Sequence, residues 1–184
     1  MRRIVLTLLL ATLLLPASAQ TVGEEESVER SVYLEQEDQA IQVRGDFDFN
    51  AEALAQEILS LTNEARRRNG LPGLKRHVAL VGAAGEHSRE MRRLNYFSHT
   101  SPTAGRETAR KRVQMFGLNP RVVAENIFEC SGYDLNMVAR IAVESFLNSP
   151  GHRKNMMSGT ITHIGIGVFE SDGSVSVTQV FGAL

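Results

Sequence analysis

The sequence predicts a layered α+β domain in residues 50–184. In four segments of this region apolar residues recur at intervals of three and four positions, which is the period of an amphipathic α-helix. From Ile164 onward the period changes to two, which is typical of a β-strand with one buried face. Helices that come first in the chain and an antiparallel hairpin that comes last favour an α+β architecture with separate layers.

The first two helices carry start and packing signals. The first follows Asn50, a residue type that caps helix N-termini, and we expect Gly70 to end it. The second spans residues 78–94 and contains Gly82 and Gly85, each of which weakens a helix by ~1 kcal/mol relative to alanine. Glycines inside a helix indicate close packing against a neighbouring element.

Two further helices are expected after these. The third is short and spans residues 105–116. The fourth spans residues 134–147, with Asp134 as its N-cap, because the apolar positions again follow the helical period. The Ser-Pro-Gly sequence at residues 149–151 is expected to end the fourth helix, since the residue before a proline disfavours helical geometry.

Three strands are predicted around the C-terminal hairpin. Residues 164–169 and 175–181 alternate on either side of Asp172 and Gly173, a pair that favours a two-residue turn. A shorter strand at residues 121–128 is placed to pair with this hairpin. We therefore expect a small antiparallel sheet.

Residues 1–19 have the pattern of a secretory signal peptide. Two arginines precede an apolar run over residues 4–15, and the small side chains of Ala17 and Ala19 favour cleavage after position 19. The apolar run is too short to cross a ~30 Å hydrocarbon core comfortably. We expect a mature chain that has no transmembrane segment and is secreted or periplasmic.

Charge divides the mature chain into two unlike regions. Residues 20–49 carry nine acidic and two basic residues, whereas residues 50–184 carry 12 acidic and 16 basic residues. The first region has too few apolar residues to offset the entropy of ordering it, so we expect an acidic linker or tail. The net charge of the mature chain is negative and no interleaved aromatic platform is visible, so nucleic-acid binding is not expected.

Composition limits the available chemistry. Hydrophobic residues make up 42% of the chain and charged residues 22%, which excludes a wholly disordered, collagen-like or polytopic membrane protein. Cys130 is the only cysteine, so neither an intramolecular disulfide nor a multi-cysteine zinc site can form. Its surroundings match no cysteine-protease pattern, and a free cysteine is more often a small buried hydrophobe than a nucleophile.

Five ordered motifs resemble one known family. They are NYFSHTSP at residues 95–102, AENI at 124–127, FLNSPGHRKN at 146–155, HIGIGV at 163–168 and TQVFG at 178–182. Their order is similar to that of a bacterial CAP domain, also called an SCP domain, from the superfamily of cysteine-rich secretory proteins, insect venom antigens and plant pathogenesis-related proteins. The resemblance covers the domain almost entirely. It implies a three-layer α-β-α sandwich and an extracellular role.

The resemblance also implies a site. Many family members carry two histidines and two glutamates around one cleft that can bind a divalent metal, and His99, Glu125 and His152 match three of these positions. Ser149 stands where the eukaryotic pattern has the second glutamate, and Phe146 replaces a tryptophan that precedes it. The resemblance therefore carries over three of the four positions.

The chemistry of these three residues leaves two interpretations. Two neutral imidazoles and one carboxylate are competent ligands for Zn²⁺, and they leave a coordination position open for water or a substrate. Zinc is therefore the cofactor that we expect if a metal binds. In the alternative interpretation, Glu125 accepts backbone N–H bonds and the two histidines hydrogen-bond to it, so that the group only holds loops together.

Two more polar residues are weaker candidates for this cleft. His87 on the second helix could line it, although a lone histidine on a half-apolar helix face is more often a packing residue. Gln179 could offer its amide to the cleft or form a cross-strand hydrogen bond. His77 and His163 are expected to be ordinary surface residues.

Two functions of different classes remain open. The first is a secreted binding module whose cleft holds a divalent metal or an apolar ligand such as a lipid, with a lipid or envelope component as the expected partner. The second is a metal-dependent hydrolase, in which His99, Glu125 and His152 hold an ion that lowers the pKa of bound water to about 7. The sequence gives no general base for the hydrolase and no oligomeric state.

Overall fold

The computed structural model describes residues 50–184, so the predicted signal peptide at residues 1–19 and acidic segment at residues 20–49 lie outside the described residues. No helix within residues 50–184 combines the length and the apolar character that a membrane crossing requires. In chain order the elements are α2 (Ala51–Arg68), β1 (Lys75–Arg76), α3 (Val78–Arg93), α4 (Ala109–Met115), β2 (Val122–Ser131), α5 (Leu135–Asn148), α6 (Pro150–Met156), β3 (His163–Ser171) and β4 (Ser174–Ala183).

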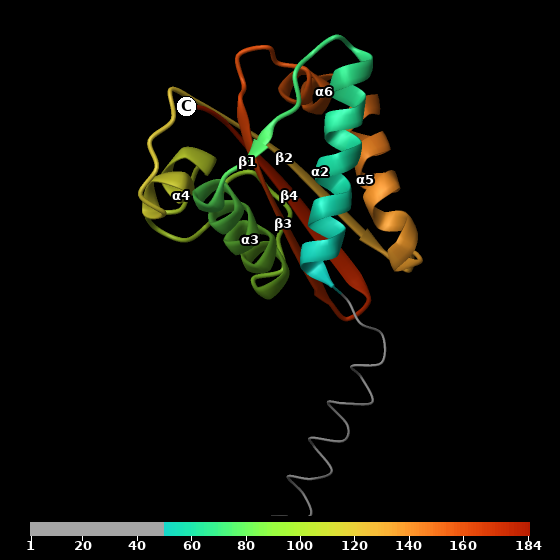
Figure 1. The fold of residues 1–184 in the computed structure, drawn as a ribbon. Helices are drawn as coiled ribbons and strands as arrows, with labels where there is room; N and C mark the ends of the chain where they lie inside the picture. The colour runs from blue at the N-terminus through green and yellow to red at the C-terminus, as the bar shows by residue number, and fades with distance from the viewer. Residues whose placement is uncertain (1–49) are drawn as a thin grey trace, which may run out of the picture. The chain divides into compact units, whose positions relative to one another are not determined.

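The elements form three layers, as the resemblance predicted (Figure 1). The central sheet has the strand order β1-β3-β4-β2. Helices α2, α5 and α6 contact one another and cover one face, while α3 and α4 cover the other. Strands β2, β3 and β4 are antiparallel, and the two-residue strand β1 adds a parallel pair to β3. The sheet is therefore mixed, with three antiparallel strands and one short parallel edge.

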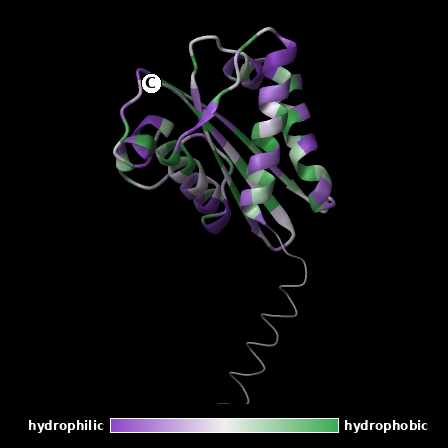
Figure 2. Ribbon diagram, in the orientation of Figure 1, coloured by the Kyte–Doolittle hydropathy of each residue, from purple (hydrophilic) through white to green (hydrophobic). Residues whose placement is uncertain are grey.

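Each face of the sheet has its own apolar cluster. The larger cluster joins α2, α5 and the sheet, and includes the fully buried Ile58 and Phe146. The smaller cluster lies between α3, α4 and the sheet, and includes Leu80 and Val113. Apolar residues accordingly line the inner sides of the helices, and hydrophilic residues line their outer sides (Figure 2).

Two glycines in β3 let α3 lie close to the sheet. A Cβ atom at Gly165 would collide with the backbone of Leu80, and a Cβ atom at Gly167 would collide with the backbone of Ala84 and Gly85. The hydroxyl of Ser88 donates to the Gly167 carbonyl across this contact, at 3.0 Å. The close packing expected from the helix glycines is present at Gly82, which lies against the Phe116 ring, but a Cβ atom at Gly85 would meet nothing within 4 Å. The close approach of α3 to the sheet therefore depends on the glycines of β3.

The local start and turn signals behave as predicted. Asn50 caps α2 through a bond from the Ala53 N–H, and Asp134 caps α5. Asp172 and Gly173 both have positive φ, at 54° and 71°, as a type I′ hairpin turn requires.

Two helix boundaries differ from the prediction. The third helix begins at Ala109 rather than near residue 105, because Thr108 is its N-cap and accepts a bond from the Lys111 N–H. The Ser149-Pro150 pair ends α5 as expected but also begins α6, a helix that the sequence analysis missed. Pro150 is the first residue of α6, a position where the absent N–H costs nothing.

Candidate functional site

The candidate site lies at the outer edge of β2, where three distant segments meet. Glu125 comes from β2, His99 from the loop between α3 and α4, and His152 from the first turn of α6. His99 Nδ1 is 2.9 Å from Glu125 Oε1, and the rings of His99 and His152 have centroids 6.4 Å apart. The structure thus places the three residues side by side.

Glu125 is a buried carboxylate with both oxygens engaged. Its side chain is only 5% exposed; Oε1 faces His99, and Oε2 accepts from Arg112 Nη2 at 2.7 Å. Burial acts to raise the pKa of Glu125, but His99, Arg112 and His87 together lower it below its usual value. Glu125 is therefore ionised, and its Oε1 accepts a hydrogen bond from the N–H at His99 Nδ1.

His87 lies behind this carboxylate rather than at the surface. It is fully buried, its Nε2 lies 3.0 Å from the Ser98 carbonyl oxygen, and the same nitrogen is 3.8 Å from Glu125 Oε1. Burial is the main cause that lowers the pKa of His87. A neutral His87 that donates to Ser98 fixes the start of the loop that carries His99.

His152 is held by an aromatic contact and by the backbone. Its ring packs edge-on against Phe146, with centroids 5.3 Å apart, and its carbonyl accepts from Asn126 Nδ2 at 3.2 Å. The Nδ1 atom is buried and has no hydrogen-bond partner within the described residues. Burial, and then the charge of His99, lower the pKa of His152, so its neutral form is favoured.

A buried amide network supports the site from the opposite face of β2. Gln179 is fully buried; its amide nitrogen donates to the Thr62 hydroxyl at 3.0 Å and its oxygen accepts from Asn126. Asn155 in turn donates to the carbonyl of Glu125 and to the Asn126 side chain. Gln179 therefore belongs to the support of the site and does not open into the cleft.

Three further residues contribute to this geometry and were not predicted from the sequence. Arg112 stands beside Arg110 and Lys111 on the third helix, where sequence alone favours an exposed position, but it is 2% exposed and holds Glu125. Asn126 and Asn155 lie inside the quoted motifs, and their place beside Glu125 and His152 was the available signal.

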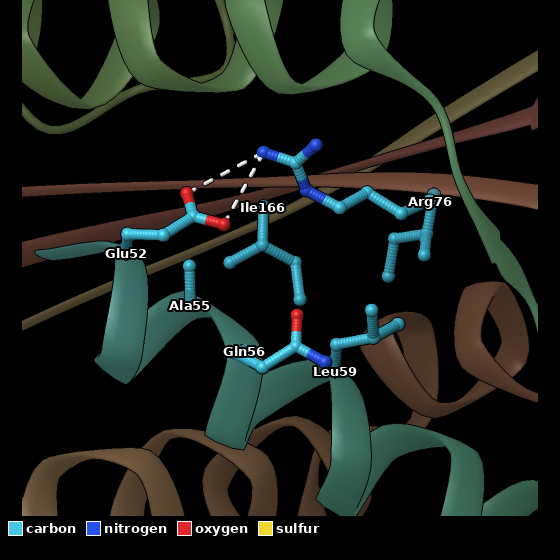
Figure 3. A pocket seen from close by; sticks show the side chains of 7 residues that line it. Glu52, Ala55, Gln56, Leu59, Arg76 and Ile166 are labelled. Atoms are coloured by element: carbon cyan, nitrogen blue, oxygen red, sulfur yellow. Dashed lines mark hydrogen bonds and ion pairs between the residues drawn. The ribbon is translucent and has the colours of Figure 1, made fainter.

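A cleft of about 390 Å³ opens beside His99 and Glu125. A different, much smaller cavity of about 10 Å³ lies between α2 and β3 (Figure 3). This small cavity is covered by the ion pair between Arg76 and Glu52 and has room for one water molecule.

The larger cleft beside His99 and Glu125 has seven further lining residues: Thr100, Glu107, Thr108, Ala109, Arg110, Val123 and Ala124.

The remaining candidates lie elsewhere. His77 caps α3 and stacks edge-on against His163 beside β1. Cys130 in β2 is partly buried, and burial raises the pKa of its thiol, which disfavours the reactive thiolate. Ser149 is the N-cap residue of α6.

The side chains that could bind a metal ion here are the imidazoles of His99 and His152. Within residues 50–184 no group of three or more His, Cys, Asp or Glu side chains stands close enough together to hold an ion. His99 is 53% exposed, whereas the Nδ1 atom of His152 has no hydrogen-bond partner among the described residues but is buried. Two imidazoles on one tetrahedral Zn²⁺, with Zn–N distances of about 2.0–2.1 Å, stand closer than 6.4 Å. The two rings would therefore have to approach each other to share one ion.

Sequence comparison identifies the family. The cysteine-rich secretory protein family, CAP, matches residues 59–181. The uncharacterized protein YkwD of Bacillus subtilis is 34% identical over 130 residues, which cover 71% of this chain and 48% of YkwD. The chain therefore spans about half the length of that relative.

Solved structures agree with this assignment. An extracellular protein containing an SCP domain from Bacillus anthracis superposes with a TM-score of 0.63 at 34% identity, over 73% of this chain and 41% of that chain. NaASP2, solved with Zn²⁺, superposes with a TM-score of 0.55 over 74% of this chain and 83% of its own, and at 15% identity it shows the fold alone. Together with the α-β-α layers, these matches show that the chain belongs to the CAP family of cysteine-rich secretory proteins.

Proposed function

We propose that the protein is a secreted CAP-type binding module and that His99, which lines the cleft, and His152, which lies beside it, hold a divalent metal ion. The observation that carries this proposal is the 2.9 Å contact between His99 Nδ1 and Glu125 Oε1. An ionised carboxylate only accepts, so it keeps the proton of a neutral His99 on Nδ1 and leaves a lone pair on Nε2. Metal-binding histidines usually have such a carboxylate behind them.

In this proposal Glu125 orients His99 instead of binding the ion. Both of its oxygens already contact side chains, one from His99 and one from Arg112. Direct ligation by Glu125 stays a prediction, and it would require one of these contacts to open. A bound ion would supply positive charge and open coordination positions for water or an anionic group of a ligand.

Secretion is supported by the signal-peptide pattern of residues 1–19 and by the similar extracellular protein of Bacillus anthracis. Zinc is supported by the two nitrogen ligands and by the presence of Zn²⁺ in the structure of NaASP2. Threonine, glutamate and arginine side chains line the cleft together with Ala109, Val123 and Ala124, so the lining offers contacts to polar and apolar groups alike. An apolar ligand at this cleft stays an untested alternative.

Binding is favoured over metal-dependent hydrolysis because the cleft offers no suitable general base within the described residues. Glu107 is partly exposed, and its bond from Lys111 lowers its pKa to about 2. The pKa of Glu125 is also lowered, and its Oε2 already accepts a hydrogen bond from Arg112 Nη2. Neither carboxylate is poised to take a proton near neutral pH.

Calorimetric titration of the purified protein with Zn²⁺ tests the proposal. His99→Ala and His152→Ala should each weaken binding at least about tenfold, because each removes one of two protein ligands. His163→Ala removes a histidine at the other edge of the sheet and should bind Zn²⁺ like the wild type. If both cleft variants retain wild-type affinity, the proposed site is wrong. Lipid that co-purifies with a metal-free protein would favour the apolar alternative.

A further inference from the structure

The cleft meets β2 along the outer edge of the sheet. β2 is the last strand in the order β1-β3-β4-β2, so one of its two edges has no neighbouring strand. Val123, Ala124 and Glu125 are consecutive residues of β2, and all three line the cleft. Consecutive strand residues direct their side chains to opposite faces of a sheet. A cleft that contacts all three residues therefore lies along the edge of the strand and not over one face.

Backbone groups of alternate β2 residues point into this cleft. In an antiparallel pair, one set of alternate residues bonds to the neighbouring strand and the other set points away from it. The N–H of Gly132, one residue past the end of β2, donates to the Gly173 carbonyl, so the even-numbered positions face β4. Asn155 donates to the Glu125 carbonyl from outside the sheet at 3.1 Å, as an odd-numbered position requires. Val123, another odd-numbered position, therefore also directs its N–H and carbonyl groups outward.

The outer edge is closed at both ends and open in the middle. At one end the Arg110 guanidinium donates to the Arg121 carbonyl at 3.2 Å, and at the other end Asn155 occupies the Glu125 carbonyl. Between them, the N–H and carbonyl of Val123 and the N–H of Glu125 have no hydrogen-bond partner in the described part of the chain. The open stretch thus presents a donor, an acceptor and a donor with the spacing of a strand.

The charges at the cleft favour a carboxylate beside Arg110. Glu107 and Glu125 line the cleft, and each already has a cationic partner, Lys111 for the first and Arg112 for the second. Arg110 donates to two backbone carbonyls, which leaves three of its five N–H groups unused. Two carboxylates therefore face three cations, and the excess positive charge lies at the Arg110 end of the edge.

We propose that this edge binds the C-terminal end of an extended peptide from a partner protein, which adds to the sheet as a strand antiparallel to β2. In this direction the peptide runs from Glu125 toward Arg121, so its terminal carboxylate meets Arg110. The third residue from its C-terminus exchanges two hydrogen bonds with Val123, and the carbonyl two residues earlier accepts from the Glu125 N–H. The inference rests on the proposed function only in assigning the cleft to ligand binding, and it requires no metal ion.

The first test is a titration with the peptide acetyl-Thr-Val-Thr-Val, which has a free carboxylate. The isotope-labelled protein is followed through its backbone amide resonances in the presence of a chelator. The Val123 and Glu125 amides should shift saturably. Val168 in β3 also points away from β4, because the His77 N–H donates to the Ile164 carbonyl at the same edge, and its amide should not shift. No saturable shift at β2, or equal shifts at Val168, would overturn the proposal.

Three matched peptides test the direction and register of the added strand. Amidation of the C-terminus removes the charge that meets Arg110 and should weaken binding about tenfold. N-methylation of the first valine removes the N–H that donates to the Val123 carbonyl and should weaken binding at least about fivefold. N-methylation of the second threonine, whose N–H points away from β2, should change affinity by at most about twofold. Equal weakening by the two methyl groups would contradict strand pairing.

An arginine substitution tests the contact with the carboxylate. Arg110→Gln should bind the acid peptide about tenfold more weakly, so that the acid and amide peptides bind equally. Arg140→Gln changes an exposed arginine on α5 and is the matched control, which should retain the wild-type preference for the acid. A retained preference in the Arg110 variant would overturn the assignment. If that variant does not fold, the peptide series on the wild-type protein decides.

The chelator separates this proposal from the metal site. Peptide binding without metal, together with failure of the Zn²⁺ titration, would support strand addition and reject the metal site at His99 and His152. Zn²⁺ binding without any peptide-induced shift at Val123 would reject strand addition alone.

Discussion

Two pairs of histidines lie at opposite edges of the sheet. At the β2 edge the rings of His99 and His152 are 6.4 Å apart, and at the β1 edge those of His77 and His163 are 5.9 Å apart. At the β1 edge both Nδ1 atoms are already used, one by the Ala79 N–H and one by the Thr162 hydroxyl. Nearness of two imidazoles is therefore a poor criterion for a site.

The β2 edge differs because a buried carboxylate stands behind its histidines. Among residues 50–184 the ion pairs of histidines involve His87 and His99, and both of these rings face Glu125. Glu125 in turn needs Arg112, since a buried carboxylate without a partner is unstable. The buried ion pair between Arg112 and Glu125, rather than the presence of two histidines, therefore distinguishes the two edges.

The largest expected effect comes from breaking this ion pair. Arg112→Ala leaves Glu125 charged and unpaired in the interior and should lower the free energy of unfolding by about 3–5 kcal/mol. The matched change at the other edge is Arg76→Ala, which breaks the exposed pair with Glu52 and should cost at most ~1 kcal/mol. Denaturant unfolding with circular dichroism measures both. Equal losses would show that the buried pair has no special role.

A smaller effect is expected from pH. Because the folded-state pKa of His87 lies below its unfolded value of 6.5, the unfolded chain binds the proton more readily. The stability that neutral His87 provides is fully present above pH 6.5 and is lost as the pH falls from 6.5 toward the folded-state pKa. Unfolding at a series of pH values should show this decline.

Substitutions of single histidines test whether His87 causes this pH dependence. His87→Gln keeps a donor for the Ser98 carbonyl and removes the titrating ring, so it should make the decline below pH 6.5 shallower. The part that remains comes from His152 and His163, whose pKa values burial also lowers. His77→Gln at the other edge is the control and should retain the wild-type slope. A wild-type slope in the His87 variant would place the titrating group elsewhere.

The sequence predicted those parts of the fold that depend on local signals. Asn50, Asp134 and the Asp172-Gly173 turn act through neighbours only a few positions away, so their roles could be identified without coordinates. Helix α6 was missed because a serine before a proline can end one helix and begin another. Strand β1 has two residues and therefore no period to detect.

The site was predicted in part for a different reason. The three residues at positions 99, 125 and 152 were found through the order of family motifs, since their spacing alone carries no chelating pattern. Arg112 could not be found in this way. An arginine on a basic helix looks exposed in sequence, and its burial depends on how α4 packs against β2, which no local pattern records.

The most direct test of the central claim is to follow the ring resonances of all five histidines during a Zn²⁺ titration of the wild-type protein. The resonances of His99 and His152 should shift together and saturate at one equivalent, while those of His77 and His163 stay in place. The claim that His99 and His152 form the binding site would be contradicted if the resonances of His77 and His163 saturated first. Equal shifts at both edges of the sheet would contradict it as well.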